Sequence, residues 1–135
     1  MAMDPTIPQN PFHIRLLYTL ALLVQLSDVY HFATLSPRFW PRRSDLSGPT
    51  STFFLRTYCT LLLPYILLCY WLRHYHIRET DVGQAVGASF ALFHALAPAW
   101  YVLSWWTGGY VQRPVGVILG FHVGCVVWAG MGWVL

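Results

Sequence analysis

The residues of this chain that could do chemistry are ionisable side chains placed inside hydrophobic stretches. Asp28, His31, His94 and His122 all lie within apolar runs, and Arg56 stands near the start of another. A charged group in the hydrocarbon region of a bilayer costs about 2.5–3.5 kcal/mol even on the more lenient insertion scale, so such groups usually face a bundle interior and have a function. An acid and several imidazoles placed there can transfer protons.

Four hydrophobic segments must position these side chains, near residues 14–34, 53–73, 83–106 and 114–135. Each approaches the roughly 20 residues that a helix needs to cross a bilayer. The composition agrees, because 56% of the residues are hydrophobic and only 10% are charged, against about 25% charged in a soluble domain. We therefore predict an all-α integral membrane bundle of four transmembrane helices, a multi-pass protein in which residues 1–135 form a single domain.

Depth along these spans places the ionisable groups in one half of the bilayer. At about 1.5 Å per residue, Asp28 lies roughly 6 Å from the midpoint of its span, and His31 follows one turn later. His94 and His122 fall close to the midplane, and Arg56 lies in the first turn of the second span. This distribution indicates a shared polar pocket in which Asp28 pairs with Arg56 or His31. The other interpretation is a hydrogen-bonded knot that only orders the bundle.

Aromatic residues near this pocket suggest what it binds. Trp100 and Tyr101 lie deep in the third span, and aromatic faces stabilise cations. Asp28 beside aromatic walls could protonate an alkene and hold the resulting carbocation, which suits isomerisation or cyclisation of an apolar, lipid-like substrate such as a sterol, terpenoid or polyketide. In this hypothesis Arg56 and Tyr58 fix a polar head group. The catalytic residues are then Asp28, as acid or base, and its proton partners His31, His94 and His122.

The sequence predicts neither a cofactor nor a metal site. His74 and His76 lie in a polar loop beside arginines and are typical of a solvated turn. A haem held by His94 and His122 is geometrically conceivable, since both lie near the midplane on different helices, but no other feature supports it. The three cysteines lie in apolar runs without CxxC spacing, which is typical of packing residues. A scattered net charge of +3 indicates no nucleic-acid partner.

Two short motifs give the chain a resemblance to a known family. Residues 56–60 read Arg-Thr-Tyr-Cys-Thr, and residues 91–94 read Ala-Leu-Phe-His. Over residues 56–130 the chain resembles the small four-span ergosterol-biosynthesis scaffold family. It departs from that family at Cys59 and Leu62, where the family has Gly and Trp, and at residues 97–98, where an acidic residue is missing. The resemblance implies a protein of the endoplasmic reticulum that holds lipid-modifying enzymes together and has no chemistry of its own.

A glycine face on the last span supports this scaffold alternative. Gly116, Gly120 and Gly124 recur every four residues and would let a neighbouring helix approach closely. The partner would be a second copy of the chain or another membrane enzyme. A third alternative is transport or proton conduction, because intramembrane Asp and His can relay protons.

The loops indicate an orientation in the membrane. An even number of spans places both termini on one side, here called side A, and the first and third loops on the opposite side, side B. Side B carries Arg38, Arg42, Arg43 and Arg113, against Arg15, Arg73 and Arg78 on side A. The excess of arginine favours side B as the cytoplasmic side.

Overall fold

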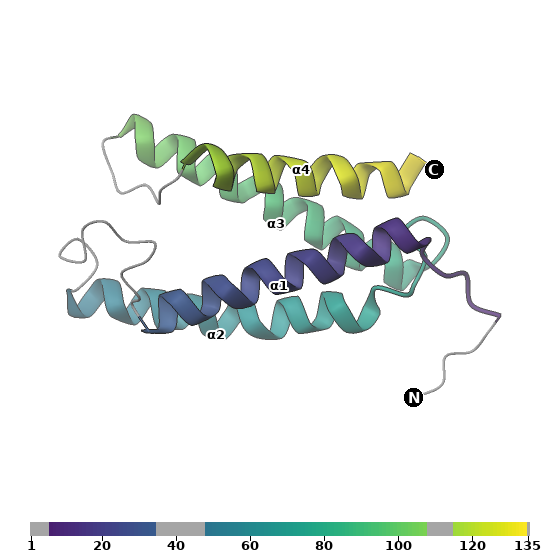
Figure 1. The fold of residues 1–135 in the computed structure, drawn as a ribbon, viewed down its shortest axis with the longest axis horizontal. Coiled ribbons are helices and arrows are strands. Elements are labelled where there is room, and N and C mark those ends of the chain that lie inside the picture. The colour runs from purple at the N-terminus through teal and green to yellow at the C-terminus, as the bar shows by residue number, and fades with distance from the viewer. Residues whose placement is uncertain (1–5, 35–47, 108–114, 135) are drawn as a thin grey trace.

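Four long helices make up most of the computed structural model, which describes residues 6–34, 48–107 and 115–134. They are α1 (Phe12–Thr34), α2 (Pro49–Leu72), α3 (Asp81–Trp106) and α4 (Val115–Val134) (Figure 1). All four are long and apolar enough to cross a membrane. The prediction of an all-α, multi-pass membrane bundle with four transmembrane helices is therefore confirmed. The side B arginines at positions 38, 42, 43 and 113 lie outside the described residues.

Local sequence signals explain where two of the helices begin. Pro49 occupies the first turn of α2, where its missing N–H costs nothing and its fixed φ suits a helix. The hydroxyl of Thr80 caps α3 by accepting a hydrogen bond from the backbone N–H of Gly83 at 3.0 Å. Asp81 follows in the first turn, where a negative charge complements the helix dipole.

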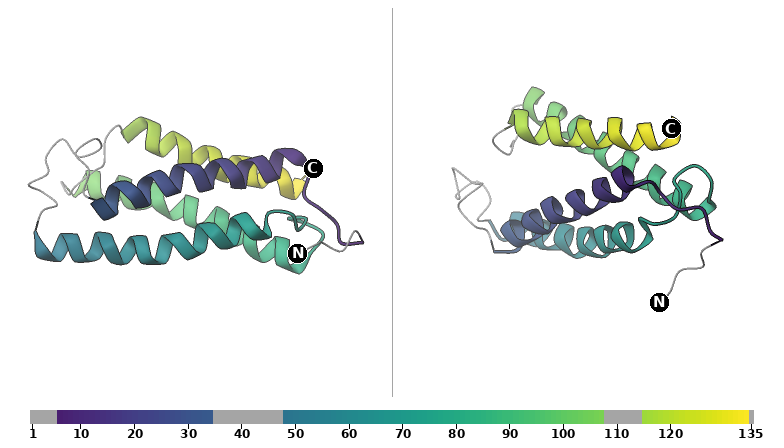
Figure 2. Two further views of the ribbon diagram at one scale, coloured as in Figure 1. Left: turned by 60° about the horizontal axis from the view of Figure 1, so that its bottom comes forward. Right: turned by 45° about the vertical axis from the view of Figure 1, so that its right-hand side comes forward.

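The helices form two antiparallel hairpins that cross each other. α1 packs mainly against α2 and α3 mainly against α4, while α1 with α4 and α2 with α3 make the weaker contacts between the hairpins. The hairpins lie close where α1 begins and α4 ends, and they diverge toward the end where α1 stops and α2 begins (Figures 1 and 2). The first end corresponds to side A and the second to side B.

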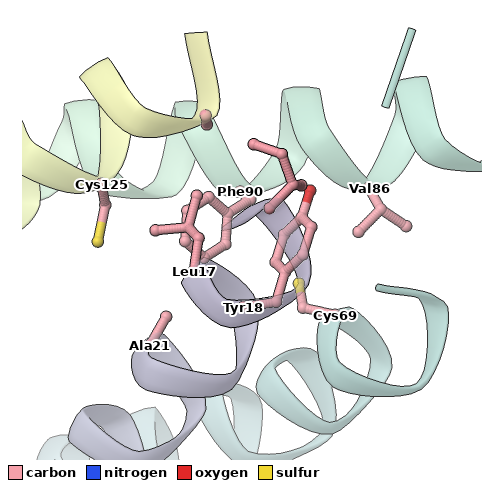
Figure 3. Packing of buried hydrophobic residues seen from close by; sticks show 9 residues of the cluster. Leu17, Tyr18, Ala21, Cys69, Val86, Phe90 and Cys125 are labelled. Atoms are coloured by element: carbon pink, nitrogen blue, oxygen red, sulfur yellow. The ribbon is translucent and has the colours of Figure 1, made fainter. Parts of the chain in front are cut away.

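An apolar core fills the side A half of the bundle. Leu17, Tyr18 and Phe90 meet at its centre, between Cys69 of α2 and Cys125 of α4 (Figure 3). The rings of Tyr18 and Phe90 pack edge to face with centroids 4.9 Å apart, an arrangement favoured by the aromatic quadrupole. All three cysteines are buried and free, as the sequence predicts.

The side A end is closed by the segment before α1, which is bound to the loop between α2 and α3. The amide nitrogen of Asn10 donates to the carbonyls of Arg73 and Tyr75 at 2.9 and 2.6 Å, and its oxygen accepts from the N–H of Ile77 at 2.8 Å. Ile77 is itself fully buried and inserts against Gly132 of α4. This contact joins all the helix ends on side A.

Replacing Asn10 by Ala should lower the free energy of unfolding by about 1–3 kcal/mol, because three backbone groups lose their partner and the N–H of Ile77 lies in a buried region. Unfolding in mixed dodecyl maltoside and SDS micelles, followed by circular dichroism, measures the change. The matched control is Gln9→Ala, since the Gln9 side chain is exposed. Equal stability of the two variants would contradict the role given to Asn10.

Candidate functional site

A cavity of about 390 Å³ lies between the two hairpins in the side B half of the bundle. Its volume is within the range of roughly 300–1,000 Å³ that is usual for small-molecule sites. Every helix contributes to it, and most of its wall is apolar or aromatic. The lining residues are Val24, Gln25, Ser27, Asp28, Phe32, Tyr58, Phe93, Ala97, Tyr101, Val117, Ile118, Phe121 and His122.

A chain of three polar side chains joins two residues of the cavity wall, His122 and Gln25, through the buried His94. Nδ1 of His122 lies 2.8 Å from Nδ1 of His94, and Nε2 of His94 lies 3.5 Å from the amide nitrogen of Gln25. His94 and Gln25 are buried, with exposed fractions of 0% and 3%. Gln25, His94 and His122 belong to α1, α3 and α4. They therefore come together only when the bundle is folded.

The short contact between the two histidines restricts their protonation. One ring must donate its Nδ1–H and the other must accept it, so the two rings cannot both be imidazolium cations in this arrangement. Among the described residues, no group of three or more His, Cys, Asp and Glu side chains is arranged to hold a metal ion.

Asp28 supplies the carboxyl group of the cavity. It lies three residues after Gln25 on α1, and residues at this spacing are neighbours on a helix surface. Asp28 is partly buried and lines the cavity together with Ser27 and Tyr58. An acid, a hydroxyl pair, an imidazole and the amide of Gln25 therefore line one mostly apolar space, and the buried ring of His94 lies behind it.

Aromatic rings surround the histidines. The ring centroid of His94 lies 4.3 Å from that of Phe90, 5.1 Å from that of Phe93 and 5.7 Å from that of Phe121. Phe93 and Phe121 also line the cavity, as does Tyr101. These rings help to bury His94 completely, and within low-dielectric surroundings its hydrogen bonds are strengthened.

The structure brings together five of the eight residues that the sequence predicts for the site. Asp28, Tyr58, Tyr101 and His122 line the cavity, and His94 contacts it through His122. The remaining three, Arg56, Trp100 and His31, are not among the lining residues. Arg56 and Trp100 are exposed, Trp100 to 65%. The ring of His31 is partly buried and packs edge to face on Tyr30, with centroids 5.3 Å apart.

Sequence reasoning missed Gln25 and the phenylalanines of the wall. Gln25 carries no charge, so a search for ionisable groups passes over it. Its signal is a polar amide near the centre of an apolar span, one turn before Asp28. Such an amide usually hydrogen-bonds across helices in a membrane, and it does so here.

The glycine face on α4 points away from the rest of the described chain. A Cβ added at Gly116, Gly120 or Gly124 would meet no atom of another described residue within 4 Å. This face therefore packs against none of the other described helices.

No known protein family, no curated protein and no solved structure matches this chain.

Proposed function

We propose that this protein is a small intramembrane enzyme that isomerises or cyclises an apolar, lipid-like substrate by transferring protons. The observation that carries the proposal is the cavity in the side B half, where Asp28 and His122 line a mostly apolar and aromatic space. A carboxyl and an imidazole can each give or take a proton near neutral pH when their surroundings tune them. An apolar wall binds the body of a sterol, terpenoid or polyketide.

Isomerisation requires one proton to enter the substrate and one to leave. One group gives a proton to a carbon or oxygen of the substrate, and the other removes a proton from a neighbouring carbon, so that the double bond moves and no proton is consumed. In cyclisation an internal double bond attacks the cationic carbon before the second proton leaves. Asp28 and His122 come from α1 and α4, which lets them address different atoms of a bound substrate.

The closed side A half favours this chemistry over proton conduction. The polar chain ends at Gln25, whose amide does not titrate, and beyond it lies the apolar core around Leu17, Tyr18 and Phe90. A proton taken up at the cavity therefore leaves by the same cavity. This is what an isomerase needs, whereas a conducting protein needs a continuous path to the other side.

The cavity also reaches the surface that faces lipid. Val24 of α1 and Val117 of α4 line it and are nevertheless 40% and 68% exposed. In a bilayer these outer faces meet hydrocarbon, so an apolar substrate could enter sideways between α1 and α4. Such a substrate would not have to cross the aqueous phase.

Filling the cavity tests the proposal. The protein in lipid nanodiscs is incubated in D₂O with apolar alkenes and enones of sterol, terpenoid and polyketide type, and deuterium bound to carbon is measured by mass spectrometry. The Ala97→Trp variant places an indole in the cavity wall and should lower exchange roughly 10-fold to 100-fold through misplacement of the substrate. Ala99→Trp is the matched control, because Ala99 is exposed two residues along the same helix and does not line the cavity.

Equal exchange in both variants, or none in the wild type, would contradict an enzymatic role. The second candidate function is then a noncatalytic scaffold for sterol- or lipid-biosynthetic enzymes, which the uncovered glycine face of α4 favours. In that case Gly120→Leu should reduce the recovery of partner membrane proteins or of a second copy in pull-downs, whereas Ala97→Trp should not. If the protein is a scaffold, the family resemblance implies that it lies in the endoplasmic reticulum.

A further inference from the structure

The hydrogen bonds that link Gln25, His94 and His122 all run the same way from donor to acceptor. Their direction determines which group of His122 a ligand in the cavity meets. The atom of Gln25 that faces His94 is the amide nitrogen, which donates and cannot accept. Nε2 of His94 must therefore accept, so a neutral His94 carries its proton on Nδ1. That Nδ1–H is the donor of the 2.8 Å contact, and Nδ1 of His122 is the acceptor.

The remaining nitrogen of His122 then carries a hydrogen. Since Nδ1 of a neutral His122 accepts from His94, its own proton lies on Nε2. His122 lines the cavity, and Nε2 is the ring nitrogen left to meet a ligand. The cavity thus places an N–H donor of His122 and the carboxyl group of Asp28 around one space, which Gln25 and Ser27 also line.

We propose, building on the function above, that the substrate is an apolar carbonyl compound whose oxygen accepts a hydrogen bond from Nε2–H of His122. Gln25 lines the same cavity, and through His94 it is the positioning residue that keeps this proton on Nε2. The substrate is an unsaturated ketone, and Asp28 as carboxylate removes a proton from its α carbon when the C=C bond is β,γ, or from its γ carbon when the C=C bond is α,β. The C–H electron pair forms a new C=C bond, and the C=O pair moves onto oxygen to give a dienolate, which the N–H stabilises. The oxygen pair then re-forms C=O while a C=C pair takes the proton back from Asp28 at the other end of the dienolate, so the double bond has moved and atoms and charge balance.

The donor also explains why a plain hydrocarbon is the poorer ligand. A neutral imidazole N–H is too weak an acid to protonate an alkene, and an alkene offers it no strong acceptor. Binding a hydrocarbon would bury this N–H without a partner, whereas a carbonyl oxygen satisfies it. Donors already oriented toward a developing oxyanion give the largest electrostatic contribution in reactions of this kind.

The first measurement is the tautomer of His122 in the full-length protein without any ligand. Nitrogen-15 NMR of histidine-labelled protein distinguishes a protonated ring nitrogen from an unprotonated one, and His122→Phe assigns the signals. We expect Nε2 of His122 to be protonated in the wild type. In Gln25→Glu a carboxylate accepts from Nε2 of His94, every bond of the chain reverses, and Nε2 of His122 should lose its proton. An unprotonated Nε2 in the wild type would overturn the proposal.

The second measurement is binding. The ligands are β-ionone labelled with carbon-13 at its carbonyl group and the isosteric hydrocarbon in which C=CH₂ replaces C=O. Bound to the wild type, the carbonyl carbon should shift downfield, and Gln25→Glu should abolish this shift and lower the affinity for β-ionone about tenfold, the effect of one lost hydrogen bond. The hydrocarbon does not accept this hydrogen bond, so its affinity should fall less than that of β-ionone, and the ratio of the two affinities is the readout. Gln84→Glu is the control, because it makes the same change at an exposed position.

The outcomes separate this inference from the proposed function. Both readouts work without turnover, so a protonated Nε2 and a shifted carbonyl signal in a protein that exchanges no deuterium would support the carbonyl site and refute the enzyme. Deuterium exchange without any preference for the ketone would support the enzyme and refute the carbonyl site. If Gln25→Glu does not fold, Gln25→Met removes the donor without adding a charge and should also lower the ratio of ketone to hydrocarbon affinity. An unchanged ratio in both variants overturns the proposal.

Discussion

Replacing Asp28 by Asn should lower carbon-bound deuterium exchange by roughly 10²–10⁴-fold, the usual contribution of a positioned acid or base. Asparagine has nearly the same shape as aspartate but does not take up or release a proton near neutral pH. Asp28 is the one carboxyl among the lining residues, so no neighbour in the described cavity can replace it. The rate of exchange in nanodiscs, measured at saturating substrate, reports the loss.

The control for this change is Asp81→Asn, which neutralises an exposed aspartate in the first turn of α3. Its exchange rate should equal that of the wild type. If Asp28→Asn instead keeps its exchange rate but unfolds at lower SDS fractions, Asp28 belongs to a knot that only orders the bundle. If Asp28→Asn or His94→Ala loses partner proteins while the chemistry is unchanged, the scaffold function is favoured.

The sequence predicts the helices well because a bilayer imposes one requirement on all of them. Each span must bond its own backbone and present an apolar surface about 20 residues long. The predicted spans near residues 14–34 and 83–106 differ by two residues or fewer from Phe12–Thr34 and Asp81–Trp106. The largest difference is at α2, which begins at Pro49 and not near residue 53, because Pro49 and the polar residues 50–52 already form its first turn.

The candidate site is predicted only in part because depth along a helix does not give the direction of a side chain. Successive residues are rotated by about 100°, so Arg56 and Tyr58 point to nearly opposite sides of α2, and Trp100 and Tyr101 diverge by about 100° on α3. In each pair the structure brings the tyrosine to the cavity. A single helix can place one member of such a pair in the site, and the sequence does not say which.

The pairing of His94 with His122 follows from packing that no single span encodes. Both residues are predicted near the midplane, but their contact at 2.8 Å depends on how α3 and α4 are rotated against each other. Gln25 completes the chain from a third helix and is neutral, so its importance becomes visible only once its neighbours are known. The polar residues thus lie at the boundary between the closed core and the open cavity, where hydrogen bonds can be satisfied on one side and a ligand met on the other.

Replacing Gly83 by Ala should lower the free energy of unfolding by about 2–4 kcal/mol, from overpacking and a weakened helix cap. A Cβ at this position would overlap the backbone carbonyl oxygen of His76 and come within 2.8 Å of Oγ1 of Thr80. The same His76 oxygen accepts from the Thr80 hydroxyl at 2.9 Å, so the loop cannot yield without disturbing the cap of α3.

Gly130→Ala is the control: its Cβ meets no described atom within 4 Å, and alanine should be neutral or stabilise α4 by up to about 1 kcal/mol. Unfolding in SDS-containing micelles compares the two. A loss no larger in Gly83→Ala than in Gly130→Ala would show that α3 does not depend on this close approach.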